Sequence, residues 1–576
     1  MNKVKLILAF ALISLSFNLH AAKPEILFLH SVDSVGMFEK FEVGFNMKAE
    51  FTNPFDPAEI DINTTFISPS GKKWSINGFY DYSFGTVWKV RFAPNEEGRW
   101  QYTIHVKDKN GSTHVDPRYF TVTKSVYHGP LHVAANHRYL EHADGAGFYG
   151  VGFWYNDSYA GFGSGRVEAQ ELDNLKKLGV NFIGTFITPL ETIASGVGRY
   201  DQNISGRLDE LLKMCEDRDM KLSLNLWFHA YLSETVWGGG NIRWYSNPYQ
   251  QITAAKDFYR SKEAWEYQEK LYRYFIARYA HSRALLTWFI VDEVNGTDGW
   301  VSGDSAMALT WATKVHDYFK KNDPYQHLTT GTRSGGIKEY WDGGYKTFDM
   351  AAREIYEAQG FPMNRTGSMD SVVDQPLAQS YKTYAGEISK LWNSYNKPAI
   401  IGESGWDHTF YEPGMPGYLA LYHNALWACL GAGSASTPFW WAFSGRLNDN
   451  MVTSQLTGIR DFTEQIPFAK LTNISKADIN VSNGDGYAIK SDQVIFGWVA
   501  NPATDVAGKT VQIDGMKAGD FTVKLFHTWR GRFLDTTQVT SSNGTISFTI
   551  PRLQMDSHGN YIGQDIAFII QPGKKE

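Results

Sequence analysis

The stretch TWFIVDEVNG, residues Thr287 to Gly296, decides how the rest of the chain is interpreted. Its uninterrupted apolar run, rich in Ile, Val and aromatic residues, predicts a strand that is buried on both faces. Two acidic residues, Asp292 and Glu293, follow the run directly. Burying carboxylates costs free energy unless nearby groups make use of them. The stretch therefore predicts a functional site at the end of a buried strand, with partner groups elsewhere in the chain.

Strand-like runs of this kind alternate with amphipathic helical patterns between residues 126 and 462. Such alternation predicts a parallel α/β sheet, and eight runs match the count of a (β/α)8 TIM barrel. The runs are GFYGVGFWYND, VNFIGTFI, KLSLNLWFHA, LLTWFIVDEV, HLTTGTRS, FDMAAREIY, PAIIGESGW and ASTPFWWAF. The stretch from Ala230 to Ser282, with WGGGNIRWYSNPYQQ and two helical patterns, lies between the third and fourth runs. Long insertions after barrel strands lie at the substrate-binding rim, so this stretch is a candidate cleft wall.

Both flanks of this region have an all-β pattern. Residues 23–125 contain short alternating segments such as WKVRFAP and WQYTIHVKD, separated by turn sequences such as NPFDP and NEEG. This spacing predicts an antiparallel β-sandwich. Similar segments, among them GYAIKSDQVIFGWV and FTVKLFHTW, return in residues 463–576 and predict a second sandwich. The predicted fold class is thus α/β, a TIM barrel flanked by N-terminal and C-terminal β-sandwich domains.

The N-terminus has the pattern of a secretory signal peptide over residues 1–22. Lys3 and Lys5 precede an apolar run from Leu6 to Phe17, and the small residues Ala21 and Ala22 follow. The run is too short to span a bilayer, and no later segment has the length and apolarity of a membrane span. We therefore expect an exported protein, periplasmic or secreted.

Composition narrows the functional classes further. The net charge of −6 provides no basic excess for nucleic-acid binding. Aromatic residues make up 15% of the chain, with 19 Trp and 31 Tyr; they either fill cores or form platforms for sugar rings. The histidines lack metal-ligand spacing, and no glycine-rich phosphate loop is found, so neither a metal nor a cofactor is expected. Cys215 and Cys429 lie in helix-like stretches and are expected to be buried free thiols, with a disulfide between them as the alternative.

A second carboxylate, Glu403, ends the seventh run, PAIIGESGW. In a closed eight-stranded barrel, the ends of strands four and seven face each other across the mouth. Glu293 and Glu403 could therefore supply the two carboxyl groups that glycoside hydrolysis needs. One of them would be an acid kept protonated by its surroundings, and its raised pKa would account for its burial. Alternatively, either Glu is a structural residue paired with an arginine.

Several motifs resemble those of clan A glycoside hydrolases, the retaining (β/α)8 families that include cellulase-like enzymes. RYFIARYAHSRALLTWFIVDEVNG resembles their fourth-strand region, and IIGESGW resembles their seventh-strand nucleophile motif. WYSNPYQQ is similar to a segment after the third strand of exported bacterial members, and PSGKKW…WKVRFAPNEEGRWQYTIHV resembles the β-sandwich module that often precedes such barrels. The resemblance implies retaining hydrolysis of a poly- or oligosaccharide, with Glu403 as nucleophile and Glu293 as acid/base.

One position departs from the clan pattern. The residue before the acid/base is usually an Asn that hydrogen-bonds the 2-hydroxyl of the sugar, whereas this chain has Asp292, an acceptor when ionised. A like charge beside Glu293 would raise the pKa of the pair. The change also alters sugar recognition, and Asn295 is a candidate for the amide role.

Other strand ends carry candidates for sugar binding: Trp154, Trp227, His229, Tyr356, Trp406 and Trp441. For each, a packed aromatic ring or a satisfied histidine is the alternative. The resemblance implies that Tyr356 orients the nucleophile and that Trp441 forms the floor of the cleavage subsite.

Two arginines at the predicted rim, Arg333 and Arg353, also have two interpretations. They either pair with Asp349, Glu354 or Glu357, or bind a carboxylate or sulfate on the substrate. The second interpretation makes an acidic or sulfated galactan a candidate substrate.

Two other functions compete with hydrolysis. The same barrel could be a non-catalytic polysaccharide-binding protein, in which Asp292 marks lost chemistry. The chain could also be a surface adhesion or assembly module whose aromatic residues all belong to the core.

Overall fold

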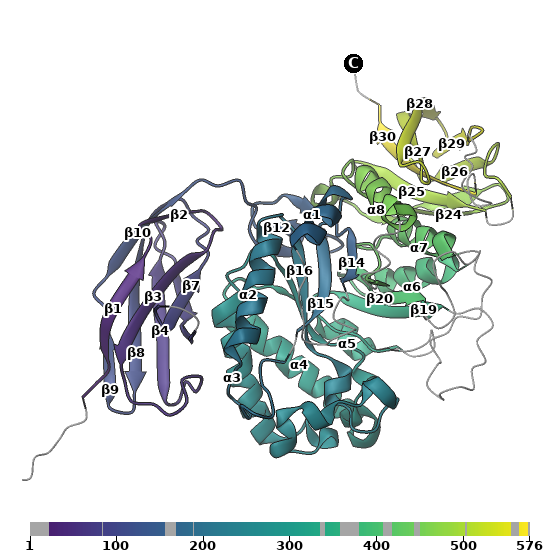
Figure 1. Ribbon diagram of the computed structural model, residues 1–576. Helices are drawn as coiled ribbons and strands as arrows, with labels where there is room; N and C mark the ends of the chain where they lie inside the picture. The colour runs from purple at the N-terminus through teal and green to yellow at the C-terminus, as the bar shows by residue number, and fades with distance from the viewer. Residues whose placement is uncertain are drawn as a thin grey trace, which may run out of the picture.

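The computed structural model describes residues 22–82, 85–155, 169–187, 189–334, 340–357, 380–406, 418–442, 450–501, 504–553 and 564–573. In chain order they form an N-terminal pair of sheets, a central parallel sheet with helices, and a C-terminal pair of sheets (Figure 1). The predicted signal peptide lies outside the described residues apart from its last position, so it stays a prediction.

The N-terminal region consists of two β-sheets that pack face to face. Rings from both sheets meet between them: Phe41 stacks on Phe120 with 3.8 Å between ring centroids, and Phe66 on Phe92 with 4.3 Å. One sheet contains, in spatial order, β1 (Glu25–Ser31), β3 (Phe41–Lys48), β7 (Trp88–Phe92) and β6 (Phe79–Tyr80). The other contains β2 (Ser34–Gly36), β10 (Arg118–Thr123), β8 (Gly98–Asp108), β4 (Ile60–Ile67) and β5 (Lys73–Asn77), with β9 (Gly111–His114) paired to β8.

A small three-stranded sheet follows, formed by β11 (Leu131–Val133), β12 (Leu140–His142) and β13 (Gly147–Phe148). It leads the chain into the central region.

The central region is built on one eight-stranded parallel sheet. Its strands are, in chain order, β14 (Gly152–Tyr155), β15 (Phe182–Phe186), β16 (Lys221–Trp227), β17 (Leu285–Val291), β18 (Leu328–Thr330), β19 (Ala351–Glu357), β20 (Ala399–Trp406) and β21 (Trp440–Ala442). Each lies within one of the eight predicted runs, except that β19 extends one residue past its run, so these strands are confirmed. β17 is buried along its whole length, as its apolar run predicted.

The order of strands across the sheet is β18-β17-β16-β15-β14-β21-β20-β19. This is the order that a (β/α)8 barrel requires. In the described residues the ladder ends at β18 and β19, which are joined by isolated contacts. The Met350 N–H donates to the Thr329 carbonyl (3.3 Å), and the Thr330 hydroxyl donates to the Met350 carbonyl (3.2 Å). Full closure of the barrel stays a prediction.

An α-helix follows every strand of this sheet. The helices are α1 (Ala169–Lys177), α2 (Gln202–Glu216), α3 (Lys262–Tyr279), α4 (Ser305–Asn322), α5 (Asp342–Thr347), α6 (Tyr381–Ser394), α7 (Tyr418–Ala432) and α8 (Asn450–Thr463). Local sequence fixes where they begin. Asp201 caps α2 by accepting from the N–H groups of Asn203 and Ile204, and the Ser261 hydroxyl accepts from the N–H of Ala264 at the start of α3.

Between β16 and α3 the chain forms short 3₁₀ turns: His229–Leu232, Gly239–Asn241, Trp244–Ser246, Pro248–Gln251 and Ala255–Asp257. Of the two helical patterns predicted there, only α3 is an α-helix. The part of the stretch before α3 forms only 3₁₀ turns.

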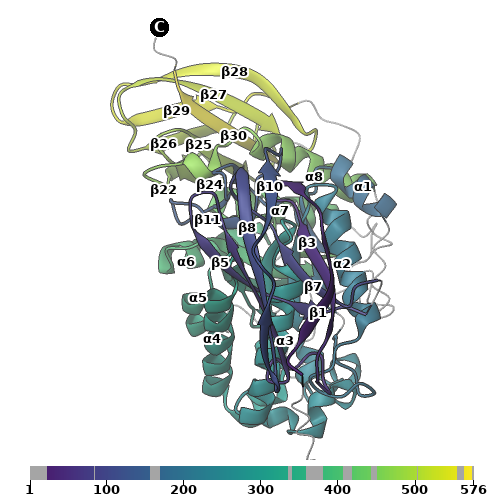
Figure 2. The same cartoon turned by 90° about the vertical axis from the view of Figure 1, so that its left-hand side faces the viewer.

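The C-terminal region again has two sheets. The larger contains β22 (Ser475–Lys476), β24 (Asp485–Lys490), β25 (Ile495–Ala500), β30 (Asp565–Pro572), β27 (Gly519–His527) and β28 (Arg532–Ser541), and the smaller contains β23 (Asp478–Val481), β26 (Thr510–Asp514) and β29 (Thr545–Thr549). Phe548 and Phe568 meet edge to face between them. Figures 1 and 2 both place these sheets at one end of the central region, where α7 contacts β24 and β25.

Two smaller predictions can be compared with the structure. Cys215 and Cys429 are buried and free, as predicted. Among the described residues, no helix has both the length and the apolarity needed to cross a membrane.

A buried ion network docks the N-terminal sheets on the central helices α2 and α3, which lie beside them in Figure 1. The carboxylate of Asp209 on α2 accepts from Arg91 of β7 at 2.5 Å and from Arg278 of α3 at 2.7 Å. The guanidinium of Arg278 is fully buried, and Asp81 lies 3.5 Å from it. Because buried charges are tolerated only when paired, this network fixes how the two regions meet.

We expect Asp209→Ala to lower the free energy of unfolding by about 3–5 kcal/mol, because two buried guanidinium groups would lose their shared carboxylate. Chemical denaturation followed by near-UV circular dichroism measures the change. The matched control is Asp217→Ala, which removes an exposed pair with Lys213 next to the same helix and should cost about 1 kcal/mol or less. Equal effects of the two substitutions would contradict a docking role for Asp209.

Candidate active site

Four carboxyl groups converge at the carboxyl ends of the central strands. Asp292 and Glu293 follow β17, Glu354 lies in β19, and Glu403 lies in β20. Oxygens of Asp292, Glu354 and Glu403 all lie within 4.8 Å of one another. Glu403 influences the pKa of Asp292, and Glu354 influences that of Glu293, so the four groups act on one another. The structure thus brings the two predicted carboxylates, Glu293 and Glu403, to one site.

A β-bulge places Glu403 beside Glu354. In the pairing of β19 with β20, Arg353 lies opposite Ile401 and Glu354 opposite Glu403, so the register skips Gly402. The carbonyl of Gly402 accepts a 2.8 Å hydrogen bond from the buried indole of Trp154. Bulges re-aim side chains next to active sites. Here the bulge puts two carboxyl groups side by side.

The backbone at Glu293 is strained. Its φ of 46° and ψ of 54° are left-handed values, which cost free energy for a residue other than glycine. Thr332, which follows β18, holds this conformation. Its hydroxyl accepts from the Glu293 N–H (3.1 Å), and its carbonyl accepts from the Val294 N–H (3.1 Å). Non-glycine strain at a strand end is typical of a functional site.

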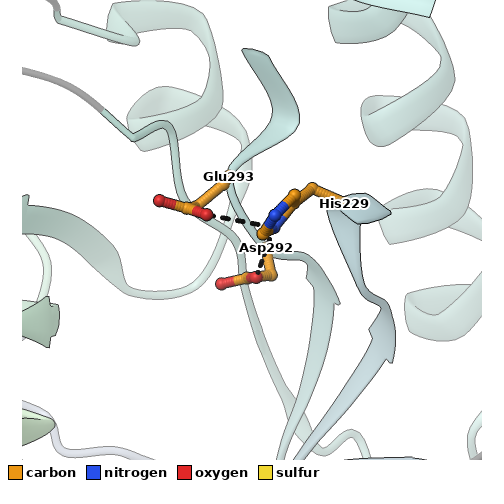
Figure 3. A group of neighbouring side chains, drawn as sticks. All are labelled: His229, Asp292 and Glu293. Atoms are coloured by element: carbon orange, nitrogen blue, oxygen red, sulfur yellow. Dashed lines mark hydrogen bonds and ion pairs between the residues drawn. The ribbon is translucent and has the colours of Figure 1, made fainter. Parts of the chain in front are cut away.

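His229 contacts two of these carboxyl groups, Asp292 and Glu293 (Figure 3). Its Nδ1 lies 3.1 Å from Asp292 and 3.0 Å from Glu293, and its Nε2 lies 3.2 Å from the side-chain oxygen of Asn241. A doubly protonated ring would donate to oxygens on both sides. Burial alone would lower the pKa of His229, but the charges of Glu293 and Asp292 outweigh it and raise the pKa to about 10.

The pKa values of Asp292 and Glu293 are shifted in opposite directions. Burial and the neighbouring charge of Glu293 raise the pKa of Asp292. Burial also acts to raise the pKa of Glu293, but the His229 cation outweighs it and lowers that pKa. A resting Glu293 kept protonated by its surroundings was expected from the sequence. His229 contradicts that expectation, because the ion pair stabilises the charged carboxylate.

Glu354 is a site residue that sequence reasoning missed, since it was considered only as a partner for an arginine. Its side chain is 1% exposed. Burial, together with the charges of Glu293 and Asp292, raises its pKa well above the usual value. The signal that could have found it is the one used for Asp292: a carboxylate inside an otherwise apolar run.

Asn241 and Trp237 were also missed as individual residues, although both lie in the stretch predicted to be a cleft wall. The half-buried ring of Trp237 approaches His229 edge to face, with 5.1 Å between ring centroids.

Two predicted sugar platforms are wrong. Trp154 has no exposed surface and stacks on Phe186 inside the sheet, and Trp227 is buried with its indole N–H donating to the Tyr272 hydroxyl at 2.8 Å. Neither ring offers a face to a sugar. For both residues the alternative, a packed aromatic, is what the structure shows.

The two arginines differ. Arg353 is buried and pairs with Glu387 of α6 at 2.9 Å, so it is not placed to bind a substrate anion. Arg333 is half-buried, with its guanidinium 5.0 Å from the ring of Trp300. Its role in binding a substrate anion stays a prediction.

Four further candidates remain untested. Asn295 donates from its amide to the Ser334 carbonyl at 2.8 Å, so this donor is used within the protein. Tyr356, Trp406 and Trp441 belong to β19, β20 and β21, but their side chains lie outside the described part of the structure.

Two sets of side chains have ligand atoms spaced closely enough for a cation: His229 with Asp292 and Glu293, and Asp292 with Glu354 and Glu403. Hard cations accept carboxylate oxygens. However, the His229 ion pairs and a shared proton would satisfy the same groups without a metal.

We expect Gly402→Ala to destabilise the protein by about 1–3 kcal/mol, because a side chain here overfills a packed core. An added Cβ would lie 2.9 Å from both Ala352 Cβ and Thr332 Cγ2. Thermal unfolding measures the effect. Gly206→Ala in α2 is the control, since nothing lies within 4 Å of its added Cβ and alanine favours a helix. Two equally tolerated substitutions would show that the bulge is not constrained.

We expect His229 to stay protonated until the pH approaches 10, as measured by NMR of ¹³C-labelled imidazole groups with His229→Asn used for assignment. Glu293→Gln should lower this pKa, because it removes the main charge that raises it. Since the folded-state pKa exceeds that of a free histidine, the stabilisation is complete below about pH 6.5 and is lost as the pH rises through the folded-state value. A pKa near 6.5 for His229 would contradict the ion pair.

Comparisons with known proteins concern the fold. A family model described as a domain of unknown function, DUF5060, matches residues 34–107 in the N-terminal sheets. No curated protein matches the chain in sequence. A solved structure from Bacteroides vulgatus, provisionally described as a glycoside hydrolase, superposes with a TM-score of 0.66 at 17% identity, over 94% of this chain and all of that one. A glycoside hydrolase family 5 protein from the same species gives a TM-score of 0.50 at 14% identity, over 77% of this chain and 94% of that one. The chain therefore shares the fold of glycoside hydrolases.

Proposed function

We propose that the protein is a retaining glycoside hydrolase of a poly- or oligosaccharide, with Glu403 as the nucleophile and Glu293 as the acid/base. The convergence of carboxyl groups from β17 and β20 at one edge of the parallel sheet carries this proposal. The shared fold supports it, because two carboxyl groups at this edge are what retaining hydrolysis requires. We also propose that the parallel sheet closes into a barrel and that the chain is exported.

The two roles are assigned from the solvent exposure of each side chain and from how firmly the backbone around it is held. Glu293 is the carboxyl group with the most access to solvent, its side chain being 14% exposed against 1% for Asp292. It is therefore suited to reach the leaving oxygen and, later, a water molecule. Glu403 lies deeper, 5% exposed, next to the Gly402 bulge. A fixed nucleophile can be aimed at the anomeric carbon, because its backbone is held on both sides.

The proposed substrate class rests on two positions, Asp292 and Arg333. Asp292 takes the place of an asparagine that would donate to a sugar hydroxyl, and it faces His229 instead. With Arg353 paired inside the protein, support for an acidic or sulfated galactan rests on Arg333 and on this replacement.

A second candidate is a non-cleaving polysaccharide-binding protein. The specific observation in its favour is the 3.0 Å ion pair of Glu293 with His229, which lowers the pKa of Glu293. A general acid that is ionised at rest cannot protonate a leaving group unless another group supplies the proton.

We expect the wild type to release new reducing ends from at least one member of a panel of neutral and sulfated polysaccharides. Glu403→Ala should lower the rate by about four orders of magnitude or more, because the nucleophile is lost. Glu464→Ala is the control, since this side chain is 65% exposed and lies just beyond α8.

The products' anomeric configuration, followed by proton NMR during the first turnovers, should be that of the substrate. Inversion, or equal rates for wild type and Glu403→Ala, would contradict the proposed mechanism. Binding without release of reducing ends would favour the second candidate.

A further inference from the structure

The roles proposed for Glu293 and Glu403 do not explain why a further glutamate, Glu354, is buried beside them. Neither of its carboxyl oxygens, both fully buried, has a hydrogen bond of good geometry among the described residues. The Thr332 hydroxyl approaches without reaching that geometry. Burying a carboxylate in this way is costly unless it is neutralised.

The groups around Glu354 are mostly anionic. Asp292 and Glu293 face it from the end of β17, and Glu403 faces it from β20. The imidazole of His229 directs its Nδ1 to Asp292 and Glu293, at 3.1 and 3.0 Å. On the same strand, the Arg353 guanidinium is ion-paired with Glu387 of α6.

A hydrogen bond between Glu354 and Glu293 would require a proton. The side chains of Glu354 and Glu293 are close enough to influence each other's pKa, and both lie beside Asp292. Ionised carboxylate oxygens are acceptors only, so two of them form a hydrogen bond only when one carries a proton. Such a pair titrates as a unit, and one proton is held to a higher pH than a single carboxyl group would hold it.

We propose that Glu354 and Glu293 share one proton, and that Glu354 is a positioning residue that holds this proton at rest and passes it to Glu293 for catalysis. The inference rests on the proposed function for its catalytic part, but the shared proton belongs to the free protein.

The proton balance closes over one turnover. The O–H bond of Glu354 breaks as an O–H bond forms on Glu293. Glu293 then gives that proton to the glycosidic oxygen while the bond from this oxygen to the anomeric carbon breaks and Glu403 bonds to that carbon. Next, water gives a proton to Glu293, its oxygen bonds to the anomeric carbon, and Glu403 is released. The proton on Glu293 returns to Glu354, and one water is consumed.

The direction of the pKa changes agrees with this geometry. Burial, followed by the charges of Glu293 and Asp292, raises the pKa of Glu354, whereas His229 outweighs burial and lowers that of Glu293. Both directions favour the proton on Glu354 rather than on Glu293.

The first test needs no substrate. Infrared difference spectroscopy of the full-length protein across pH detects the C=O stretch of protonated carboxyl groups. We expect a band at neutral pH in the wild type that is lost in Glu354→Gln. Glu191→Gln is the matched control: Glu191 is a buried carboxyl whose pKa burial raises to about 8, so this variant should lose a different band. An unchanged spectrum in Glu354→Gln, with the Glu191 band removed by its own variant, would overturn the shared proton.

A bound cation is the competing explanation of the acidic cluster. If EDTA treatment of the purified wild type makes the band appear, a cation rather than a proton neutralises Glu354, and the inference fails. A band present before EDTA and unchanged by it supports the proton.

The second test uses the pH dependence of kcat/KM on whichever polysaccharide the wild type cleaves. Without Glu354 the proton must rest on Glu293 alone, so the alkaline limb in Glu354→Gln should move to lower pH by about one unit or more. Glu354→Asp keeps a carboxyl group and should restore part of the shift. A lower rate with an unmoved alkaline limb would indicate a merely structural role and overturn the proposal.

The two tests separate the inference from the proposed function. If the wild type cleaves nothing but the band behaves as expected, the hydrolase proposal and the catalytic relay fail together, while the shared proton stands. If cleavage occurs and the band is absent, the inference alone fails.

Discussion

The crowding of negative charge at one edge of the parallel sheet is the constraint on which the site depends. Four carboxyl groups meet where solvent is largely excluded, and repulsion between them is strong there because the surroundings screen charge weakly. His229 balances part of this negative charge by pairing with Asp292 and Glu293. The rest must be neutralised by protons or by further partners. The protonation of each carboxyl group in the site therefore depends on its neighbours more than on its own intrinsic pKa.

This arrangement requires two local distortions of the backbone. Glu293 has a left-handed backbone, held by Thr332 at the end of the adjacent strand. Gly402 is skipped in the register of β19 and β20, and Trp154 satisfies its carbonyl from within the core. Both distortions aim carboxyl groups into the site. They persist because fully buried strands surround them and leave the backbone few alternatives.

Sequence patterns predicted the strands well, because apolar runs and alternating runs follow directly from burial. The placement of Glu293 and Glu403 was also predictable, since residues at the ends of parallel strands share one edge. The direction of each side chain was not. Trp154 and Trp227 lie at strand ends yet point into the core, and Arg353 and Glu354 are neighbours that serve a structural pair and the site, respectively. A bulge of one residue changes the face to which the following side chains point, and the local sequence pattern does not predict where a bulge occurs.

The contradiction between an expected acid and a lowered pKa at Glu293 has a physical resolution. In the proposed retaining mechanism, Glu293 must give a proton in the first step and accept one in the second. A pKa raised by burial alone would help the first step and hinder the second. Here His229 on one side favours the charged form of Glu293, and the buried carboxyl of Glu354 on the other keeps a proton within reach. The two demands are thereby divided between neighbours, so that Glu293 itself need not be tuned to both.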